Sequence, residues 1–174
     1  DPAAEILADL GSAGLWLRDG TSWRTLSAMN AEGAVLVDAD ADGADEVLAD
    51  FGAAGLWLCD AGTWTAVSGA NAESQVAVDV DGSGAQEIVA DFGPTGLWFW
   101  GSGSWTALSG LNAEGLVPGE ENGLPGLETV VDFGAPGLWI WSAASGWAQT
   151  SGADADGLIT ADIDSDGLAE IIGD

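Results

Sequence analysis

Three short acidic segments carry the residue types and the spacing of a metal-binding loop. Each presents side-chain oxygens at positions 1, 3, 5 and 9, a Gly at position 6 and a backbone carbonyl at position 7. That many hard oxygen ligands around one point suit calcium, and Gly at position 6 permits the sharp turn that gathers them. The predicted calcium ligands are Asp38, Asp40, Asp42, Ala44 and Glu46, then Asp79, Asp81, Ser83, Ala85 and Glu87, then Asp162, Asp164, Asp166, Leu168 and Glu170. Ala44, Ala85 and Leu168 would contribute the backbone carbonyl.

The loops are not equivalent. Ser83 places a neutral hydroxyl at position 5 of the second loop, and one fewer charge should weaken binding without abolishing it. A fourth segment, residues 120–128, starts with Glu120 and has Leu124 at position 5 and Pro125 at position 6. Leu124 cannot ligate a metal and Pro125 cannot take the positive φ open to Gly, so we expect no ion there.

Ordinary polar turns are the alternative for each loop taken alone, because Asp and Gly dominate turns in general. The same acidic pattern at the same place in three copies of a repeat favours calcium instead. A helical EF-hand requires Glu at position 12, where the first loop has Ala49 and the last has Gly173. The residues after each loop alternate as in a strand, which predicts a calcium loop within a β-hairpin.

The loops recur within a unit of 41 or 42 residues. Each copy has a segment of the form Glu-x-x-x-Asp-Phe/Leu-Gly, then Gly-Leu-Trp, then a second Trp, then Asn-Ala-Glu or, in the last copy, Asp-Ala-Asp. The chain is therefore predicted to be a single repeat domain, with units 5–45, 46–86, 87–127 and 128–169 and a partial fifth unit, 170–174.

Apolar runs of four to seven residues separate the turn residues, and such runs are too short for helices. In the second unit they predict strands at 33–38, 46–51, 56–60 and 63–68. Apolar side chains fall on both faces, so each small sheet should be covered on both sides. The sequence predicts an all-β fold, a β-propeller or part-propeller of four-stranded antiparallel blades. A β-sandwich is the alternative, but it explains the strict repeat less well.

Charge is the extreme feature of the composition. The 29 Asp and Glu face only two Arg and no Lys or His, which gives a formal net charge of −27. Such a balance argues against nucleic acid and anionic membranes as partners. Because 47% of the residues are hydrophobic and ten are Trp, we expect a folded chain in spite of this charge. Cations bound into the structure would relieve the repulsion.

Two further exclusions come from cysteine and hydropathy. Cys59 is the only cysteine, so no disulfide can form within the chain. No apolar run approaches the ~18 residues that span a bilayer, so membrane insertion is not expected. Residues 1–5 have neither the basic nor the apolar part of a signal peptide, so a secreted protein would appear here in a mature or excised form.

The order of strand, acidic loop, strand, Asp-Phe-Gly and Gly-initiated aromatic strand resembles the FG-GAP/VCBS family of β-propeller repeats. Integrin α-subunit heads and propeller lectins similar to Psathyrella velutina lectin share this pattern. The resemblance implies one calcium per intact loop and an extracellular or cell-surface setting. Family propellers usually have more blades than this chain has repeats, so three arrangements stay open: a slice of a longer array, a self-assembling part-propeller, or a closed four-blade ring.

The residue inventory bears on three classes of function. An enzyme is not expected, because the chain lacks His, Lys and Tyr and its acidic residues recur in every unit. Carbohydrate binding is supported by the Trp residues, whose rings can stack on sugars. Most of them recur in every unit and suit packing, whereas Trp100 and Trp141 are irregular and are the better ligand-binding candidates.

We therefore predict a secreted or surface calcium-binding module for binding or adhesion, with lectin-like carbohydrate recognition as its more specific form. The alternative is a structural scaffold in which calcium only stabilises the repeats. Strand edges left unpaired at incomplete units would then pair with another copy of the chain.

Overall fold

The computed structural model describes residues 5–121, 123 and 126–174. Within them the chain is all-β: 17 strands form five antiparallel sheets, and the only helical segments are single turns of 3-10 helix. The described residues divide into two compact units, the first containing 5–34 and 47–71 and the second containing the rest. The predicted all-β class is confirmed.

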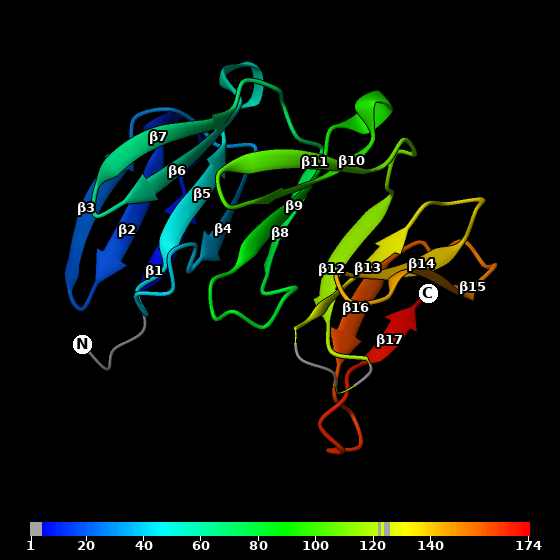
Figure 1. Cartoon of the computed structure of the whole chain (residues 1–174). Coiled ribbons are helices and arrows are strands. Elements are labelled where there is room, and N and C mark those ends of the chain that lie inside the picture. Colours follow the sequence, from blue (N-terminus) through cyan, green and yellow to red (C-terminus); the bar gives the residue numbers. More distant parts are fainter. Residues whose placement is uncertain (1–4, 122, 124–125) are drawn as a thin grey trace. The chain divides into compact units, whose positions relative to one another are not determined.

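The strands are short and are joined by turns and loops (Figure 1). The first seven are β1 (Ile6–Asp9), β2 (Leu15–Asp19), β3 (Ser22–Ser27), β4 (Gly33–Val37), β5 (Glu46–Asp50), β6 (Leu56–Asp60) and β7 (Thr63–Ser68). The next five are β8 (Ser74–Val78), β9 (Glu87–Asp91), β10 (Leu97–Gly101), β11 (Ser104–Ser109) and β12 (Gly115–Gly119). The last five are β13 (Glu128–Asp132), β14 (Leu138–Ser142), β15 (Gly146–Ser151), β16 (Leu158–Ala161) and β17 (Glu170–Gly173).

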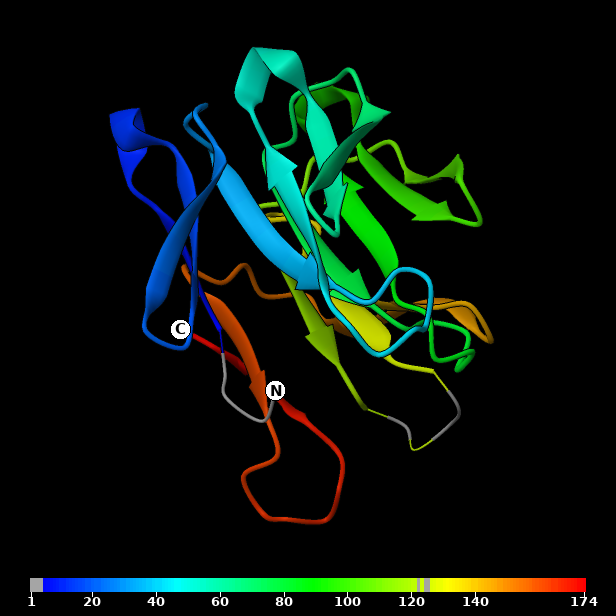
Figure 2. The same ribbon diagram turned by 90° about the vertical axis from the view of Figure 1, so that its left-hand side faces the viewer.

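Strands that are consecutive in the chain are neighbours in every sheet, an up-and-down order that can be followed in Figures 1 and 2. The sheets have the orders β1-β2-β3, β4-β5-β6-β7, β8-β9-β10-β11, β12-β13-β14-β15 and β16-β17. In each four-stranded sheet the third and fourth strands are joined by a tight turn. In the turn between β6 and β7, Ala61 and Gly62 both have positive φ, 45° and 85°. This is the pattern of a two-residue hairpin turn whose twist matches that of the strands.

The four strands predicted at 33–38, 46–51, 56–60 and 63–68 are confirmed to within one residue at each end. A β-bulge shifts the register between the Leu and the Trp of each Gly-Leu-Trp segment, as between Leu56 and Trp57. The Gly before them is required by close packing. At Gly55, with φ of 79°, an added Cβ would lie 2.2 Å from the carbonyl oxygen of Ser68.

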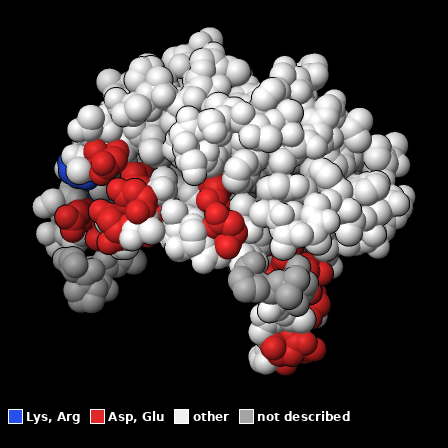
Figure 3. Space-filling model, in the orientation of Figure 1, with Lys and Arg blue, Asp and Glu red and all other residues white. Residues whose placement is uncertain are grey.

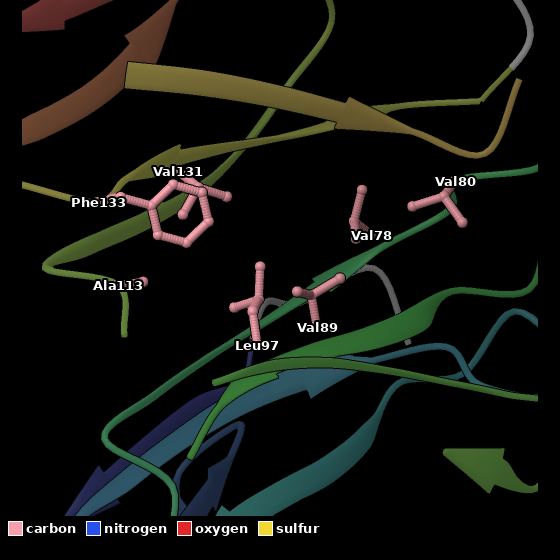
Figure 4. Close-up of a cluster of buried hydrophobic side chains, with 7 residues drawn as sticks. All are labelled: Val78, Val80, Val89, Leu97, Ala113, Val131 and Phe133. Atoms are coloured by element: carbon pink, nitrogen blue, oxygen red, sulfur yellow. The ribbon is translucent and has the colours of Figure 1, made fainter. Parts of the chain in front are cut away.

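A hydrophobic core in the second unit lies between successive sheets (Figure 4). Val89 and Leu97 come from the sheet β8 to β11, and Val131 and Phe133 come from β13 and the turn after it. The first strands of successive repeats also meet, because β12 packs against β8 and against β16. Sheets in this unit are therefore stacked face to face, with apolar side chains between them.

The first unit has a core of the same design. Val47 and Ala49 of β5 and Phe51 after it pack with Leu15 of the preceding repeat and with Cys59. Trp64 packs against this cluster, and its indole N–H donates a hydrogen bond of 3.0 Å to the carbonyl of Leu26. In the second unit Trp147 donates in the same way to the carbonyl of Leu108, at 3.2 Å. A Trp on a fourth strand thus ties each of these repeats to the one before it.

Candidate functional site

The acidic loops occupy equivalent places in the fold. Residues 38–46 join β4 to β5, residues 79–87 join β8 to β9, and residues 162–170 join β16 to β17. All three loops belong to the second compact unit. Both ribbon views show the loop between β16 and β17 projecting beyond its strands, and Figure 3 shows Asp and Glu gathered in separate groups. The predicted position of the loops, between first and second strands, is confirmed.

Backbone amides hold the carboxylates of the first loop in place. The N–H of Gly43 donates to Oδ2 of Asp38 at 3.1 Å, and the N–H of Asp42 donates to Oδ1 of Asp40 at 3.1 Å. The N–H of Ala44 donates to Oδ1 of Asp42 at 2.8 Å. Ligand oxygens of the three Asp side chains lie within 4.8 Å of one another. These hydrogen bonds orient the three Asp side chains toward one another.

The other two loops repeat this hydrogen-bond pattern. In the last loop the amides of Asp166, Gly167 and Leu168 donate to Asp164, Asp162 and Asp166 at 3.1, 3.0 and 2.9 Å. In the middle loop the amides of Ser83, Gly84 and Ala85 donate to Asp81, Asp79 and the Ser83 hydroxyl at 2.9, 2.9 and 3.3 Å. The ligand oxygens that converge are those of Asp162, Asp164 and Asp166 in one loop and Asp79, Asp81 and Glu87 in the other.

The Glu at position 9 also forms a hydrogen bond within each loop. One oxygen of the Glu accepts a hydrogen bond from the N–H of position 2, as Glu46 does from Ala39 at 2.9 Å and Glu170 from Ile163 at 2.9 Å. Glu87 does the same for Val80 at 3.0 Å. Its burial raises the pKa of the Glu87 carboxyl above the ordinary value; the Val80 amide lowers it, and the charges of Asp81 and Asp79 raise it further.

The first loop also contains an oxygen without a partner. Oδ1 of Asp38 is buried and has no hydrogen bond within the described part of the chain. A buried carboxylate oxygen beside two further carboxylates is the arrangement that a bound cation would stabilise.

The loop 120–128 differs in composition from the three acidic loops. The amide of Gly123, at position 4, donates to Oε1 of Glu120 at 2.8 Å, as the amide of Ser165 at position 4 does to Oδ1 of Asp162 at 2.6 Å. Burial raises the pKa of Glu121, and the charges of Glu128 and Glu170 raise it further. Leu124 and Pro125, on which the prediction of an empty site rests, lie outside the described residues. No acidic group that could hold a metal is found among the described residues of this loop.

Sequence reasoning missed one feature of the loops, a second left-handed residue at position 4. Ala41 has φ of 60° and Ser165 has φ of 65°, while the middle loop has Gly82 at this position with φ of 71°. The sequence carries no signal for this conformation in Ala or Ser, because only Gly adopts it without steric cost.

Replacing Ala41 by Gly should raise the free energy of unfolding by about 1 kcal/mol, because the left-handed conformation costs an L-residue about that much more than Gly. Urea unfolding in the presence of a chelator measures the change. Ala44→Gly in the same loop is the matched control, since Ala44 has no positive φ and Gly there should be neutral or destabilising. A loss of stability in Ala41→Gly would show that the loop conformation is wrong.

The Asp-Phe-Gly and Asn-Ala-Glu turns of neighbouring repeats lie together. The N–H groups of Glu32, Glu73 and Glu114 donate to the carbonyls of Asp50, Asp91 and Asp132, at 2.8, 2.8 and 2.7 Å. The Asp side chain also caps its own turn, as Asp50 does by accepting from Gly52 at 2.9 Å.

Asp91 is the most buried of the Asp residues at these turns, with 0% of its surface exposed. Neither carboxylate oxygen has a hydrogen bond of good geometry within the described residues, although the amides of Ala113 and Gly93 lie nearby. Burial raises the pKa of Asp91 to about 6; the Ala113 amide lowers it, the charge of Glu73 raises it and the Gly93 amide lowers it. These features describe a buried carboxyl group at the turn after β9.

Most of the recurrent Trp donate their indole N–H to a backbone carbonyl. In each Gly-Leu-Trp segment the Trp donates to the carbonyl three residues before it, as Trp57 does to Ala54 at 2.8 Å and Trp139 to Pro136 at 3.1 Å. Trp64 and Trp147 donate to the preceding repeat. The ring faces and edges of these Trp are what remains for a ligand.

An apolar pocket of about 190 Å³ opens on such ring surfaces in the first unit. It is lined by Ser27, Met29, Phe51, Trp57 and Trp64, and the rings of Phe51 and Trp64 meet edge to face with centroids 5.4 Å apart. Sequence reasoning assigned Trp57 and Trp64 to packing because they recur. The structure shows that both pack against the core and also line the pocket.

The two Trp predicted to bind a ligand lie elsewhere. Trp100 is half-buried on β10, opposite Trp105 of β11. Trp141 is half-buried on β14, packs against the core of the second unit and has its ring centroid 5.5 Å from that of Phe99. Neither lines the pocket at Phe51, so their role in binding stays a prediction.

Comparisons with known proteins identify the type of fold. No protein-family model and no curated protein matches the chain. Among solved structures it resembles an Agrocybe aegerita lectin, from work on the specific recognition of non-reducing terminal N-acetylglucosamine. The TM-score is 0.66 at 16% sequence identity, over 98% of this chain and 60% of the lectin chain. None of the described helices is long and apolar enough to cross a membrane. Nearly the whole of this chain has the β-sheet-rich fold of that lectin, and it spans about three fifths of the lectin's length.

Proposed function

We propose that this chain is a calcium-stabilised carbohydrate-binding module of β-propeller repeats that works outside the cell or at its surface. The observation that carries the proposal is the aromatic pocket at Phe51, Trp57 and Trp64, found in a chain that shares its fold with a lectin. The module acts by binding and adhesion, and no catalytic group is assigned to it.

The propeller arrangement is supported by the way repeats stack in the second unit. First strands neighbour one another, β8 beside β12 and β12 beside β16, and the sheets that begin with β8 and β12 each continue to a fourth strand. In a propeller the first strands line the central axis and the sheets pack face to face around it. FG-GAP/VCBS repeats are the family whose strand and loop order this arrangement fits.

Calcium is the cation that fits the three intact loops. Each offers carboxylate and carbonyl oxygens, with the Ser83 hydroxyl added in the middle loop, and none offers nitrogen or sulfur; such a set favours a hard cation. In the first and last loops three Asp converge, and in the middle loop two Asp and Glu87 do. Three bound ions would change the formal charge from −27 to −27 + 6 = −21 and so relieve repulsion within the second unit.

A sugar ring is the ligand that suits the pocket. The apolar faces of pyranose rings and their methyl substituents pack on aromatic rings, and Phe51, Trp57 and Trp64 offer three of them. The volume of about 190 Å³ lies below the ~300 Å³ of pockets for drug-sized ligands, so one sugar residue would occupy it. The Ser27 hydroxyl is the polar group on the lining that could orient a sugar hydroxyl.

Calcium should raise the melting temperature in a concentration-dependent way, because an ion bound only by the folded state stabilises it by mass action. Asp42→Ala and Asp166→Ala should each remove one ion from the stoichiometry, whereas Glu120→Ala should remove none. Differential scanning calorimetry and equilibrium dialysis measure both effects. A melting temperature that is the same in chelator and in millimolar calcium would remove calcium from the account.

Removing an aromatic wall of the pocket should weaken carbohydrate binding. Trp57→Ala should lower the affinity for the best ligand on a glycan array by at least about tenfold, a loss of about 1.4 kcal/mol. Met29→Ala tests the same pocket at a side chain that is 45% exposed and so should leave folding intact. Titration calorimetry with that glycan gives the affinities.

Trp23→Ala is the matched control for these variants. Trp23 occupies the same repeat position as Trp64 but is 47% exposed and lies outside the pocket, so binding should not change. Trp100→Ala tests the other candidate directly. Loss of binding in Trp100→Ala with full binding in Trp57→Ala would move the site from Phe51 to β10.

A scaffold role is the second candidate, and the sheet β16-β17 favours it. Among the described strands β17 pairs only with β16, and Ile159 and Ile172 are 58% and 39% exposed. Such side chains would be covered if another copy of the chain packed there. The solution mass of the calcium-loaded protein distinguishes this role from that of a monomeric binding module.

A further inference from the structure

Successive acidic loops of the second unit are joined to one another by backbone hydrogen bonds. The carbonyl of position 1 in one loop accepts from the N–H of position 8 in the next. Gln86 donates to Asp38 at 2.7 Å, Leu127 donates to Asp79 at 2.7 Å, and Ala169 donates to Glu120 at 2.6 Å. Position 1 carries the first predicted calcium ligand, and position 8 directly precedes the last one. The link between the loops 38–46 and 79–87 therefore connects the predicted ligand residues of two neighbouring loops.

The link between the first two loops is doubled. Besides the bond from its own N–H, Gln86 accepts a hydrogen bond from the N–H of Asp38 through its side-chain oxygen, at 3.0 Å. Both backbone groups of Asp38 are thus held by one residue of the next loop. The side chains at position 8 of the other two links, Leu127 and Ala169, cannot form the second bond. This side-chain contact is special to the loops 38–46 and 79–87.

Ordering in one of these loops must therefore affect the other. An ion in the loop 79–87 would fix Glu87 and with it the adjacent peptide of Gln86. A fixed Gln86 restrains the backbone of Asp38, whose carboxylate is the first ligand of the other loop. The second ion then meets a loop that has already lost part of its conformational freedom, so it binds more tightly.

We propose that the loops 38–46 and 79–87 bind their two calcium ions as a positively coupled pair, with Gln86 as the residue that couples them. This inference rests on the calcium binding proposed above. The loop 162–170 is excluded from the coupled pair, because its link leads to the loop 120–128, where no metal group is found among the described residues. The calcium affinity that the loop 79–87 loses because Ser83 is uncharged is then restored in part by coupling to the loop 38–46.

The coupling can be measured on the whole chain by calcium titration calorimetry after chelator treatment. Asp164→Ala silences the last loop and serves as the background for all variants. Adding Asp81→Ala leaves only the loop 38–46, and adding Asp40→Ala leaves only the loop 79–87. The overall constant for two ions in the background protein should exceed the product of the two single-site constants by about fivefold or more.

Gln86→Leu tests the coupling residue. Leu is the natural residue at position 8 of the loop 120–128, so this change keeps a side chain that the position accommodates and retains the backbone bond. In this variant the ratio of the overall constant to the product of the two single-site constants should fall toward one, while two ions still bind. Reciprocity gives an independent check: Asp81→Ala must weaken the first loop by the same factor as Asp40→Ala weakens the second.

The outcomes separate the coupling from calcium binding itself. Two ions that bind with an overall constant equal to the product of the single-site constants would overturn the coupling and leave calcium binding intact. Coupling that persists in Gln86→Leu would remove Gln86 from its role. Heat of binding from none of the three loops in the unmutated protein would overturn both the coupling and the calcium proposal.

Discussion

Repulsion between carboxylates is the constraint on which the rest of this structure depends. The second unit contains all four loops of the acidic series, and three of them bring carboxylate oxygens within 4.8 Å of one another. Backbone amides oppose this repulsion in part, since each loop directs several N–H groups at its own carboxylates. Amide dipoles alone leave a net negative charge in each loop, and bound cations complete the compensation in our account.

The same repeats are tied together by contacts that do not depend on charge. Apolar side chains fill the space between sheets, and a Trp on the fourth strand donates to a carbonyl of the preceding repeat. The acidic loops are connected as well, because the N–H of position 8 in one loop donates to the carbonyl of position 1 in the loop before it. Neighbour-to-neighbour contacts of this kind make stability a sum over repeats and interfaces. They also place the ligand-binding elements of one repeat under the influence of the next.

The sequence predicted the strands of the second repeat closely because Gly and Asp mark every turn and because the pattern returns after 41 residues. The positions of the acidic loops followed for the same reason. The left-handed residues at position 4 and the bonds between loops could not be predicted. Ala41 and Ser165 carry no mark of positive φ, and backbone donors and acceptors are the same in every residue. The pocket was missed because Trp57 and Trp64 recur, and recurrence was equated with packing alone.

The most direct test of the central claim is a crystal structure of the calcium-loaded chain, with anomalous scattering used to locate the ions. The account predicts one ion in each of the loops 38–46, 79–87 and 162–170. Each ion should be coordinated by side chains at positions 1, 3, 5 and 9 and by the carbonyl of position 7, with no ion at 120–128. Ordered calcium held by Glu120 and its neighbours, or none in the loops at Asp38 and Asp162, would contradict it.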